Sequence, residues 1–462
     1  MKDVYDFLVI GGGSAGYAAA RTALEFTSSV AVVEGAEELG GLCILRGCMP
    51  SKTLIYASEV LHRAKEGHVL GLNIPLATAE MARVQARKKA VVNEFADYRK
   101  QGLESGKFDL IRSHAVLTSK NEILLSDGRR VTAKKTLIAT GSKVNIPDVP
   151  GLKESKAWTS DDVLNLDFIP ESVVVFGGGI VGCELAQFLA RIGTQVTIIQ
   201  RSKQLLKDMS PEAGECLRQA FESEGIHVMT DTLVSKIGGI SGEGVTIQFN
   251  HKGCESTVKA KYLFNALGRE PNTSGLNLQV AGVDLKDSGH VVANGFMQSS
   301  NPDIYAAGDC VGPYEIVHIA VQQGETAAKH ALGQTVPEID YALLMSVIFT
   351  DPQIAVVGKT AAQLSRGGTP FISARYPFDD HGKSILMEAK RGYVAIFSDD
   401  TGGRILGAEI MGRDAGELIH IFSVAIQMKA TVFDLLRAPW YHPTLAEIVT
   451  YPLEEIVERL RK

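Results

Sequence analysis

The sequence predicts an α/β protein in which two similar strand–loop–helix units are followed by a C-terminal α+β domain. Glycine-rich loops at residues 11–16 and 177–182 each follow an apolar strand and precede an apolar helix. After about Val336 these loops stop, and short strands with turn residues precede a long apolar helix. Strands that alternate with helices predict parallel sheets, whereas the later pattern predicts an antiparallel sheet.

The composition excludes few functions. The chain has 462 residues, 45% hydrophobic and 22% charged, with a formal net charge of −6. These values are ordinary for a globular protein of several domains. The charge gives no general attraction to nucleic acid or anionic membranes. The N-terminal segment lacks a signal-peptide pattern, and no apolar run reaches the ~18 residues of a membrane span. We therefore expect a cytoplasmic protein that neither binds nucleic acid nor inserts into a membrane.

The first glycine-rich loop has the spacing G-x-G-x-x-G at Gly11, Gly13 and Gly16, and Glu34 ends the next strand. The first glycine allows a tight turn, the second lets the backbone approach a pyrophosphate, and the third lets helix and strand pack closely. The helix N-terminus offers N–H groups to phosphates, and the Glu34 carboxylate can accept hydrogen bonds from a ribose. A Rossmann-like dinucleotide-binding domain is predicted here.

The same unit returns at Gly177, Gly179 and Gly182, after the strand SVVVF. Repetition of the loop in the same strand–helix context predicts a second Rossmann-like domain. The chain therefore has two expected dinucleotide sites.

The two sites differ at the end of the second strand. Gln200 stands where the first site has Glu34, and Arg201 follows it. A carboxylate would repel a 2′-phosphate, whereas a neutral amide beside an arginine removes the repulsion and supplies donors. Lys207 would add a second positive charge. This pattern favours NADP(H) over NAD(H) at the second site.

Two further strands end in small residues, LIATGS at 137–142 and IYAAGDC at 304–310. We expect Asp309 to cap a following helix and to bind a flavin's sugar chain.

A long helix is expected at 79–105. It carries Arg83, Arg87, Lys88 and Lys89, which we interpret as a solvent-exposed face of that helix.

The C-terminal region contains expected antiparallel strands, a hairpin turn at 400–403 and a single long helix at 415–436. It lacks a glycine fingerprint, so an interface role is expected. Four segments follow from these patterns: the first part of a nucleotide-binding domain at 1–147, a second nucleotide-binding domain at 148–267, a return to the first at 268–336, and an interface domain at 337–462.

Cys43 and Cys48 stand four residues apart in GGLCILRGCMPSK, next to an expected helix that begins around Pro50. A zinc site would need a second ligand pair, and the other four cysteines are scattered. Thiols at a helix N-terminus favour the thiolate that disulfide exchange requires. A redox-active disulfide is therefore favoured over a metal site or a structural disulfide, and no bound metal is predicted.

In these motifs the chain resembles the class I flavoprotein disulfide reductases, which include glutathione reductase, dihydrolipoamide dehydrogenase and mercuric reductase. The resemblance covers essentially the whole chain. It rests on the two fingerprints, the cysteine pair with PSK, ATG at 139–141, ALGREPN at 266–272, AAGD at 306–309, FTDPQIAVVG at 349–358 and HPTLAE at 442–447.

The resemblance implies an enzyme that passes electrons from NADPH through FAD to the Cys43–Cys48 disulfide. Cys48 would face the flavin, and Cys43 would attack the substrate. His442, oriented by Glu447, would act as acid and base across an obligatory homodimer interface.

The resemblance also implies cofactor contacts. Lys52 and Glu184 would pair beside the flavin. The expected FAD-binding residues are Gly11, Gly13, Ser14, Ala15, Gly16, Glu34, Gly41, Lys52, Ala139, Thr140, Gly141, Gly308, Asp309 and Ala320. The expected nucleotide-binding residues are Gly177, Gly179, Ile180, Val181, Gly182, Gln200, Arg201, Lys207 and Gly268.

The substrate stays open between lipoyl, glutathione-like and other small disulfides. The aliphatic side chain of Ile180 resembles the residue that dihydrolipoamide dehydrogenases have at this position. The cations Arg201 and Lys207 instead resemble those of enzymes that use NADPH. Arg46, between the cysteines, would lower a thiol pKa, face an anionic substrate, or lie exposed to solvent or in a salt bridge. Mercuric reductases usually carry a C-terminal cysteine pair, which this chain lacks. Two alternatives are a flavin-dependent reductase of metal ions or quinones, and a dimeric flavoprotein that serves as a redox sensor or complex subunit.

Overall fold

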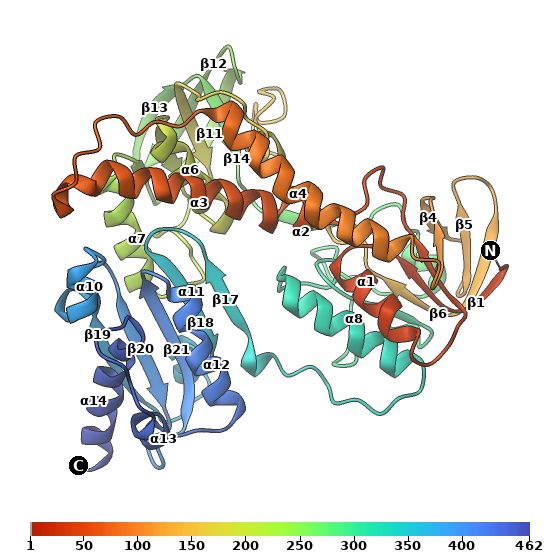
Figure 1. The fold of residues 1–462 in the computed structure, drawn as a ribbon. Coiled ribbons are helices and arrows are strands. Elements are labelled where there is room, and N and C mark those ends of the chain that lie inside the picture. Colours follow the sequence, from red (N-terminus) through yellow and green to blue (C-terminus); the bar gives the residue numbers. More distant parts are fainter. Residues whose placement is uncertain (1) are drawn as a thin grey trace. The chain divides into compact units, whose positions relative to one another are not determined.

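A computed structural model describes residues 2–462 (Figure 1). The chain forms two compact units, each made of three segments. The first unit contains residues 2–54, 82–145 and 268–340, and the second contains 55–81, 146–267 and 341–462. We describe each unit separately. The division into segments at 147, 267 and 336 stays a prediction.

The first unit is built on a seven-stranded sheet in the order β3-β2-β1-β6-β5-β4, with β16 also paired to β6. The pairs β1–β2, β2–β3, β1–β6 and β16–β6 are parallel, whereas β4, β5 and β6 form an antiparallel meander. The strands are β1 (Val4–Ile10), β2 (Val30–Val33), β3 (Asp109–Ile111), β4 (Ala115–Leu117), β5 (Glu122–Leu125), β6 (Arg130–Ile138) and β16 (Ile304–Ala306). All four residues of β2 are buried, as expected for a strand covered on both faces. The predicted parallel sheet is confirmed.

The helices of this unit place the glycine-rich loop. Helix α1 (Ser14–Ala23) packs against α8 (Val317–Ala331), and a side chain at Gly324 of α8 would overlap the Ala15 carbonyl (Figure 1). Helices α2 (Leu42–Arg46), α3 (Cys48–Lys65) and α4 (Met81–Leu103) follow β2 in the chain. A two-stranded ribbon pairs β7 (Ser142–Val144) with β15 (Arg269–Pro271).

The second unit begins with the second Rossmann-like fold. Its four-stranded parallel sheet has the order β10-β9-β8-β14, and an antiparallel three-stranded sheet β11-β12-β13 packs against it. The strands are β8 (Ser172–Phe176), β9 (Gln195–Ile199), β10 (His227–Met229), β11 (Thr232–Ile240), β12 (Gly244–His251), β13 (Cys254–Ala260) and β14 (Tyr262–Asn265). The helices are α5 (Ser160–Leu164), α6 (Ile180–Ile192) and α7 (Pro211–Ser223).

The C-terminal domain is an antiparallel five-stranded sheet in the order β17-β18-β21-β20-β19. Helix α14 (Thr450–Leu460) packs on β19 and β20 and buries Leu453 and Ile456 (Figure 1). The strands are β17 (Met345–Ile348), β18 (Gln353–Gly358), β19 (Ile372–Pro377), β20 (Tyr393–Ser398) and β21 (Ile405–Gly412), with helices α9 (Ala361–Arg366) and α10 (Gly382–Leu386) between them. The predicted hairpin turn is confirmed: Asp399 Oδ1 accepts the N–H groups of Thr401, Gly402 and Gly403.

The single long helix predicted at 415–436 is wrong. The segment forms three helices, α11 (Ala415–Leu418), α12 (His420–Gln427) and α13 (Val432–Arg437). Lys429 has a positive φ of 56°, and the Ile405 N–H donates to the Ala430 carbonyl, so the chain leaves helical geometry there. Thr431 then caps α13, because its hydroxyl accepts the Asp434 N–H.

No helix within residues 2–462 combines the length and the hydropathy that crossing a bilayer requires.

Candidate active site

The first glycine-rich loop joins β1 to α1 in a conformation that only glycine adopts readily. Gly11 has a φ of 106°, and a side chain there would overlap the Ala139 carbonyl. A side chain at Gly16 would overlap the Gly11 carbonyl. The loop therefore brings the N-terminus of α1, at Ser14, close to the end of β6, where Ala139 and Thr140 lie.

Glu34 follows β2, and its carboxylate accepts a hydrogen bond from the same loop. Its Oε2 accepts the Gly12 N–H at 2.8 Å, and its Oε1 accepts the Ala36 N–H at 2.8 Å. The carboxylate is thereby fixed at the edge of the loop, where the ribose of a dinucleotide is expected.

The surroundings of this loop fit FAD. A Cβ atom at Gly41 would lie 2.7 Å from the Gly13 Cα, so the two glycines leave a narrow cradle for a pyrophosphate. Gly141 and Gly308 have φ angles of 69° and 80°. The buried Thr140 hydroxyl has no hydrogen-bond partner within residues 2–462 and offers a group for the cofactor. Ala320 lies buried in the first turns of α8.

Asp309 does not cap a helix, so that prediction is wrong. Helix α8 begins at Val317, and Ile316 is its N-cap residue. Seven residues of irregular chain, 310–316, separate Asp309 from the helix, because Gly312 and Pro313 interrupt regular structure. Asp309 Oδ2 instead accepts the Ser142 hydroxyl at 2.6 Å.

The second glycine-rich loop repeats the geometry of the first. Gly177 has a φ of 115°, and a side chain at Gly182 would overlap the Gly177 carbonyl. The Gly178 N–H donates to Gln200 Oε1 at 3.0 Å, as the Gly12 N–H does to Glu34. In the second site, the amide nitrogen of Gln200 therefore corresponds to the second carboxylate oxygen of Glu34 in the first site.

The cations beside this loop are exposed. Within residues 2–462, Arg201 and Lys207 form no ion pair, so both are available to an anionic ligand. Ile180 and Val181 begin α6 with 44% and 41% of their surface exposed. Gly268, with a φ of 95°, lies just before β15.

The two cysteines lie on consecutive helices. Cys43 is in α2, Cys48 is the first residue of α3, and Gly47 separates the helices. Helix α3 therefore begins at Cys48, before Pro50. Neither cysteine is in a disulfide, and both are half-buried. The pKa of the Cys43 thiol is raised, first by its hydrogen bond with Cys48 and then by burial.

Arg99 is a neighbour of Cys43 that sequence patterns did not single out. Its guanidinium lies over the Tyr17 ring at 4.4 Å, and its charge lowers the pKa of Cys43. Arg21 lies 5.8 Å from the same ring. Arg99 Nη1 is buried without a hydrogen-bond partner in the described part of the chain. No motif marks Arg99, because its role depends on the packing of α4 against α1.

The interpretation of helix 79–105 as a solvated face is wrong for Lys88. Its side chain is buried, and burial lowers its pKa. Arg83, Arg87 and Lys89 are exposed or half-exposed.

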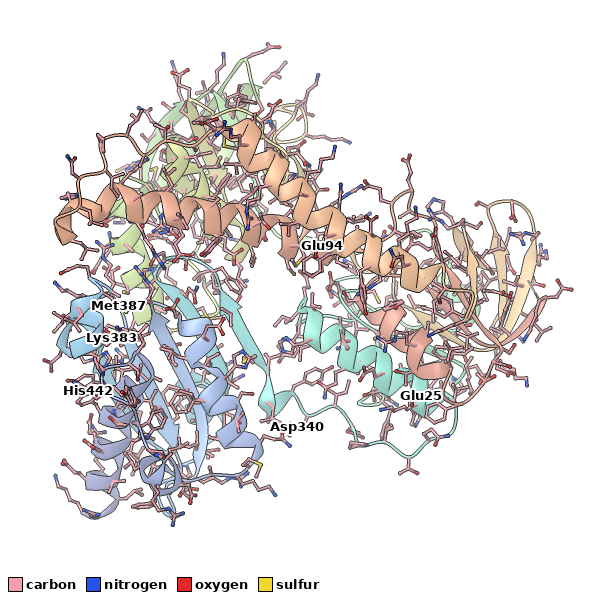
Figure 2. The ribbon with its side chains drawn as sticks, viewed as in Figure 1. Glu25, Glu94, Asp340, Lys383, Met387 and His442 are labelled. Atoms are coloured by element: carbon pink, nitrogen blue, oxygen red, sulfur yellow. The ribbon has the colours of Figure 1, made fainter. Side chains whose placement is uncertain are left out.

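His442 and Glu447 form the predicted dyad. His442 Nδ1 lies 3.0 Å from each oxygen of the Glu447 carboxylate. Glu447 is buried, whereas 77% of the His442 side chain is exposed within the single chain. Figure 2 labels His442 in the C-terminal domain. Nε2 of His442 is therefore free to face a reactant.

A second histidine contacts the same carboxylate. His381 Nε2 lies 3.5 Å from Glu447 Oε1, and the residue is fully buried. Sequence patterns missed His381, because it stands alone in FDDHGKS and comes close to Glu447 only through folding.

Glu184 lies on α6 and is almost fully buried. Its Oε1 accepts the Phe349 N–H at 2.9 Å, which links α6 to the FTDP segment. Lys52 lies on the first turns of α3. The Lys52–Glu184 pair stays a prediction. Within residues 2–462, no three His, Cys, Asp or Glu side chains are grouped so that they could hold a metal ion.

Comparisons with known proteins agree with this geometry. The family model described as pyridine nucleotide-disulphide oxidoreductase matches residues 5–324, and the dimerisation domain of that family matches residues 344–452. Mercuric reductase of Lysinibacillus sphaericus is 32% identical over 96% of this chain and 81% of its own length. Dihydrolipoyl dehydrogenase of Bacillus subtilis is 32% identical over 96% of this chain and 94% of its own length.

Solved structures extend the agreement to the whole fold. LpdA of Mycobacterium tuberculosis has a TM-score of 0.86 at 25% identity, over 97% of this chain and 99% of that chain. The HOCl-induced flavoprotein disulfide reductase RclA of Escherichia coli also has a TM-score of 0.86, at 23% identity and with the same coverage, and supports the fold alone. The chain therefore belongs to the pyridine nucleotide-disulphide oxidoreductase family and is an FAD- and NAD(P)H-dependent flavoprotein disulfide oxidoreductase.

Proposed function

We propose that the protein reduces a lipoyl-bearing or small disulfide with electrons that pass from NADPH through FAD and the Cys43–Cys48 pair. The observation that carries the proposal is the hydrogen-bonded pair of thiols next to the FAD cradle. Gly41, two residues before Cys43, contacts Gly13 of the first glycine-rich loop. The organisation into four segments and the assignment of the site residues belong to this proposal.

FAD, when bound, accepts a hydride from the nicotinamide and delivers the electron pair to the disulfide. Residues of the first unit would hold FAD: Gly11, Gly13, Ser14, Ala15, Gly16, Glu34, Gly41, Lys52, Ala139, Thr140, Gly141, Gly308, Asp309 and Ala320. Residues around the second loop would hold the nucleotide: Gly177, Gly179, Ile180, Val181, Gly182, Gln200, Arg201, Lys207 and Gly268. Glu184 and Lys52 would form an ion pair beside the flavin.

The reduced cysteines would then exchange with the substrate. The Cys43 thiolate attacks one sulfur of the substrate disulfide, forms a mixed disulfide and releases one substrate thiolate. The Cys48 thiolate attacks the Cys43 sulfur, restores the Cys43–Cys48 disulfide and releases the second substrate thiolate. The raised pKa of Cys43 supports this division of roles, because Cys43 then needs a base to become a nucleophile.

His442 would be that base. Its exposed Nε2 takes the Cys43 proton and returns it to a leaving substrate thiolate, while Glu447 holds Nδ1. The dimerisation domain supports a homodimer in which His442 acts on the Cys43 of the other subunit. The free state of the other cysteines supports a reducing, cytoplasmic location.

The preference for NADPH gives a first prediction. Arg201→Ala raises the KM for NADPH about tenfold to a hundredfold, because one charge-assisted hydrogen bond contributes about 1.5–3 kcal/mol. The KM for NADH stays unchanged. Gln200→Glu moves the preference toward NADH, since a carboxylate repels the 2′-phosphate. Steady-state kinetics with both nucleotides measure these effects. Lys203→Ala, an exposed cation on the same segment, is the control. A wild-type enzyme that uses NADH and NADPH equally well contradicts the prediction.

Arg99 gives a second prediction. Arg99→Met raises the pKa of Cys43 further, because the guanidinium charge favours the thiolate. We expect alkylation of Cys43 in the reduced holoenzyme to slow about tenfold at fixed pH, which corresponds to about one pKa unit. Mass spectrometry of alkylated peptides measures the rate. Arg21→Met, which removes the more distant cation on the Tyr17 ring, is the matched control. Equal rates in the wild type and Arg99→Met would show that Arg99 does not act on Cys43.

The substrate class is tested by anaerobic turnover of the FAD-loaded protein. NADPH is offered with lipoamide, glutathione disulfide, other small disulfides, a quinone, Hg(II) or Cu(II). Rapid reduction of one disulfide identifies the class. The relatives named mercuric reductase make a metal ion the second candidate acceptor. Turnover with a metal ion or quinone alone would overturn the proposed function.

A further inference from the structure

His381 lies between a 3-10 helix (Phe378–Asp380) and α10, and its side chain is fully buried. Its Nδ1 lies 2.8 Å from the Ser384 hydroxyl, which is also buried. Its Nε2 lies 3.5 Å from Glu447 Oε1. That separation is too long for a formed hydrogen bond, and Nε2 has no other partner in the described part of the chain.

The Glu447 carboxylate therefore stands between two imidazoles of different character. On one side, exposed His442 lies 3.0 Å from both oxygens. On the other side, buried His381 faces Oε1. A carboxylate divides its hydrogen-bonding capacity among its donors, so each additional donor weakens its hold on the others. The position of His381 thus affects how strongly Glu447 binds the His442 imidazolium.

The tautomer of His381 sets the direction of its hydrogen bond with Ser384. When the Ser384 hydroxyl donates to Nδ1, the ring proton lies on Nε2 and faces Glu447. Burial lowers the pKa of His381, and Glu447 opposes this effect only in part. His381 is therefore a neutral donor at neutral pH and becomes charged only in more acidic solution.

Two tyrosines and two carboxylates lie near His381 on its other sides. The Tyr451 ring stands edge-on to His381 at 6.1 Å and stacks on Tyr376. Burial raises the pKa of Tyr376 to about 12, and its hydroxyl donates to the Asp380 carboxylate. Asp379 also lies close to Tyr376.

We propose that His381 is a positioning residue whose Nε2–H faces the Glu447 carboxylate across 3.5 Å and, through this electrostatic contact, sets the pH at which His442 exchanges its proton. The proposal rests on the role of His442 given above. It adds a buried histidine, which does not touch the substrate, to the proton-transfer machinery of the site. The effect is electrostatic, so it changes the pH dependence of thiol exchange in addition to any effect on maximal rate.

Two variants of similar size separate this role from simple packing. In His381→Gln, the side-chain amide nitrogen reaches the position of Nε2 and keeps a donor toward Glu447. In His381→Asn, the amide nitrogen reaches only the position of Nδ1, so the donor toward Glu447 is lost. His251→Gln is the control, because His251 Nδ1 also pairs with a hydroxyl, that of Thr232 at 2.6 Å, but in another domain.

The first measurement is the NMR titration of the His442 ring in the histidine-labelled, FAD-loaded dimer, with the signal assigned by His442→Gln. We expect His381→Asn to move the midpoint upward by about half to one pH unit, the usual scale for one neighbouring group. His381→Gln and His251→Gln keep the wild-type midpoint. An unchanged midpoint in His381→Asn, or equal shifts in the Asn and Gln variants, would overturn the proposal.

The second measurement is the pH profile of kcat for disulfide reduction. If His381→Asn shifts the His442 midpoint in the NMR titration but leaves the pH profile of kcat unchanged, His381 remains a positioning residue. The role of His442 in turnover is then refuted. A matching move in both supports the two roles together. The NMR titration needs no substrate, so it decides on His381 even when no disulfide in the panel is reduced.

Discussion

Cys43→Ser is expected to reduce NADPH-driven disulfide turnover by at least about a thousandfold, the usual result of removing an essential nucleophile. A serine hydroxyl does not attack a disulfide at neutral pH, and without the Cys43 sulfur no mixed disulfide forms. Reduction of bound FAD by NADPH should persist, because hydride transfer takes place before the thiols act. Stopped-flow bleaching of the flavin absorbance measures the first step, and release of substrate thiol measures the second.

Cys254→Ser serves as the control for this substitution. Cys254 is an exposed, free cysteine on β13, far along the chain from Cys43, and we expect both steps to keep wild-type rates. If Cys43→Ser turns over disulfides at the wild-type rate, the cysteine pair is not the exchange centre. If Cys43→Ser keeps only metal-ion or quinone reduction, electrons leave the flavin by another route.

His442→Gln is expected to lower disulfide turnover by about a hundredfold to ten-thousandfold, the range that general acid–base catalysis contributes. The raised pKa of Cys43 is the physical reason, since a thiol that holds its proton needs a base nearby. The loss should shrink at high pH, where more of the Cys43 thiol ionises without a base. Steady-state rates across pH, with His420→Gln as an exposed control, test this result.

Glu447→Gln should produce a smaller loss in the same direction. The amide keeps the shape of the side chain and one hydrogen bond to His442 Nδ1, but it removes the negative charge that stabilises the imidazolium. Equal turnover in wild type and His442→Gln across the whole pH range would rule out His442 as the base.

Local sequence patterns were sufficient for the two Rossmann-like folds. Their signals lie within short stretches: Gly11 and Gly177 have positive φ angles that a side chain would disfavour, and apolar strands flank them. The antiparallel C-terminal sheet and its turn at 400–403 were likewise recognisable from strand and turn residues.

The errors came from interactions between distant segments. The helix predicted at 415–436 breaks at Lys429 because the chain pairs with the start of β21, about 25 residues earlier, a contact that helical periodicity does not reveal. Asp309 has the composition of a cap but precedes irregular chain rather than a helix. Lys88 is charged and yet buried, which depends on what α4 packs against.

The site was predictable where motifs carry it and was missed where packing creates it. The pair His442 and Glu447 lies within one short motif, so its geometry follows from local chain folding. Arg99 and His381 reach Cys43 and Glu447 from other elements, and no spacing rule connects them. Electrostatic tuning of a site therefore remained invisible until the fold was known.

The bond from the second loop to Gln200 has an evolutionary consequence. Glu34 and Gln200 accept the corresponding N–H groups of their own loops, those of Gly12 and Gly178. The two side chains have the same length and differ only in one terminal atom and its charge. Glutamine and glutamate codons differ at a single base. A point mutation at codon 200 would therefore give the second loop the chemistry of the first without rebuilding its backbone. If the second loop binds NADPH as proposed, this one mutational step would shift the enzyme toward the other coenzyme pool, and selection by the cell's supply of reduced nucleotides would decide which variant persists.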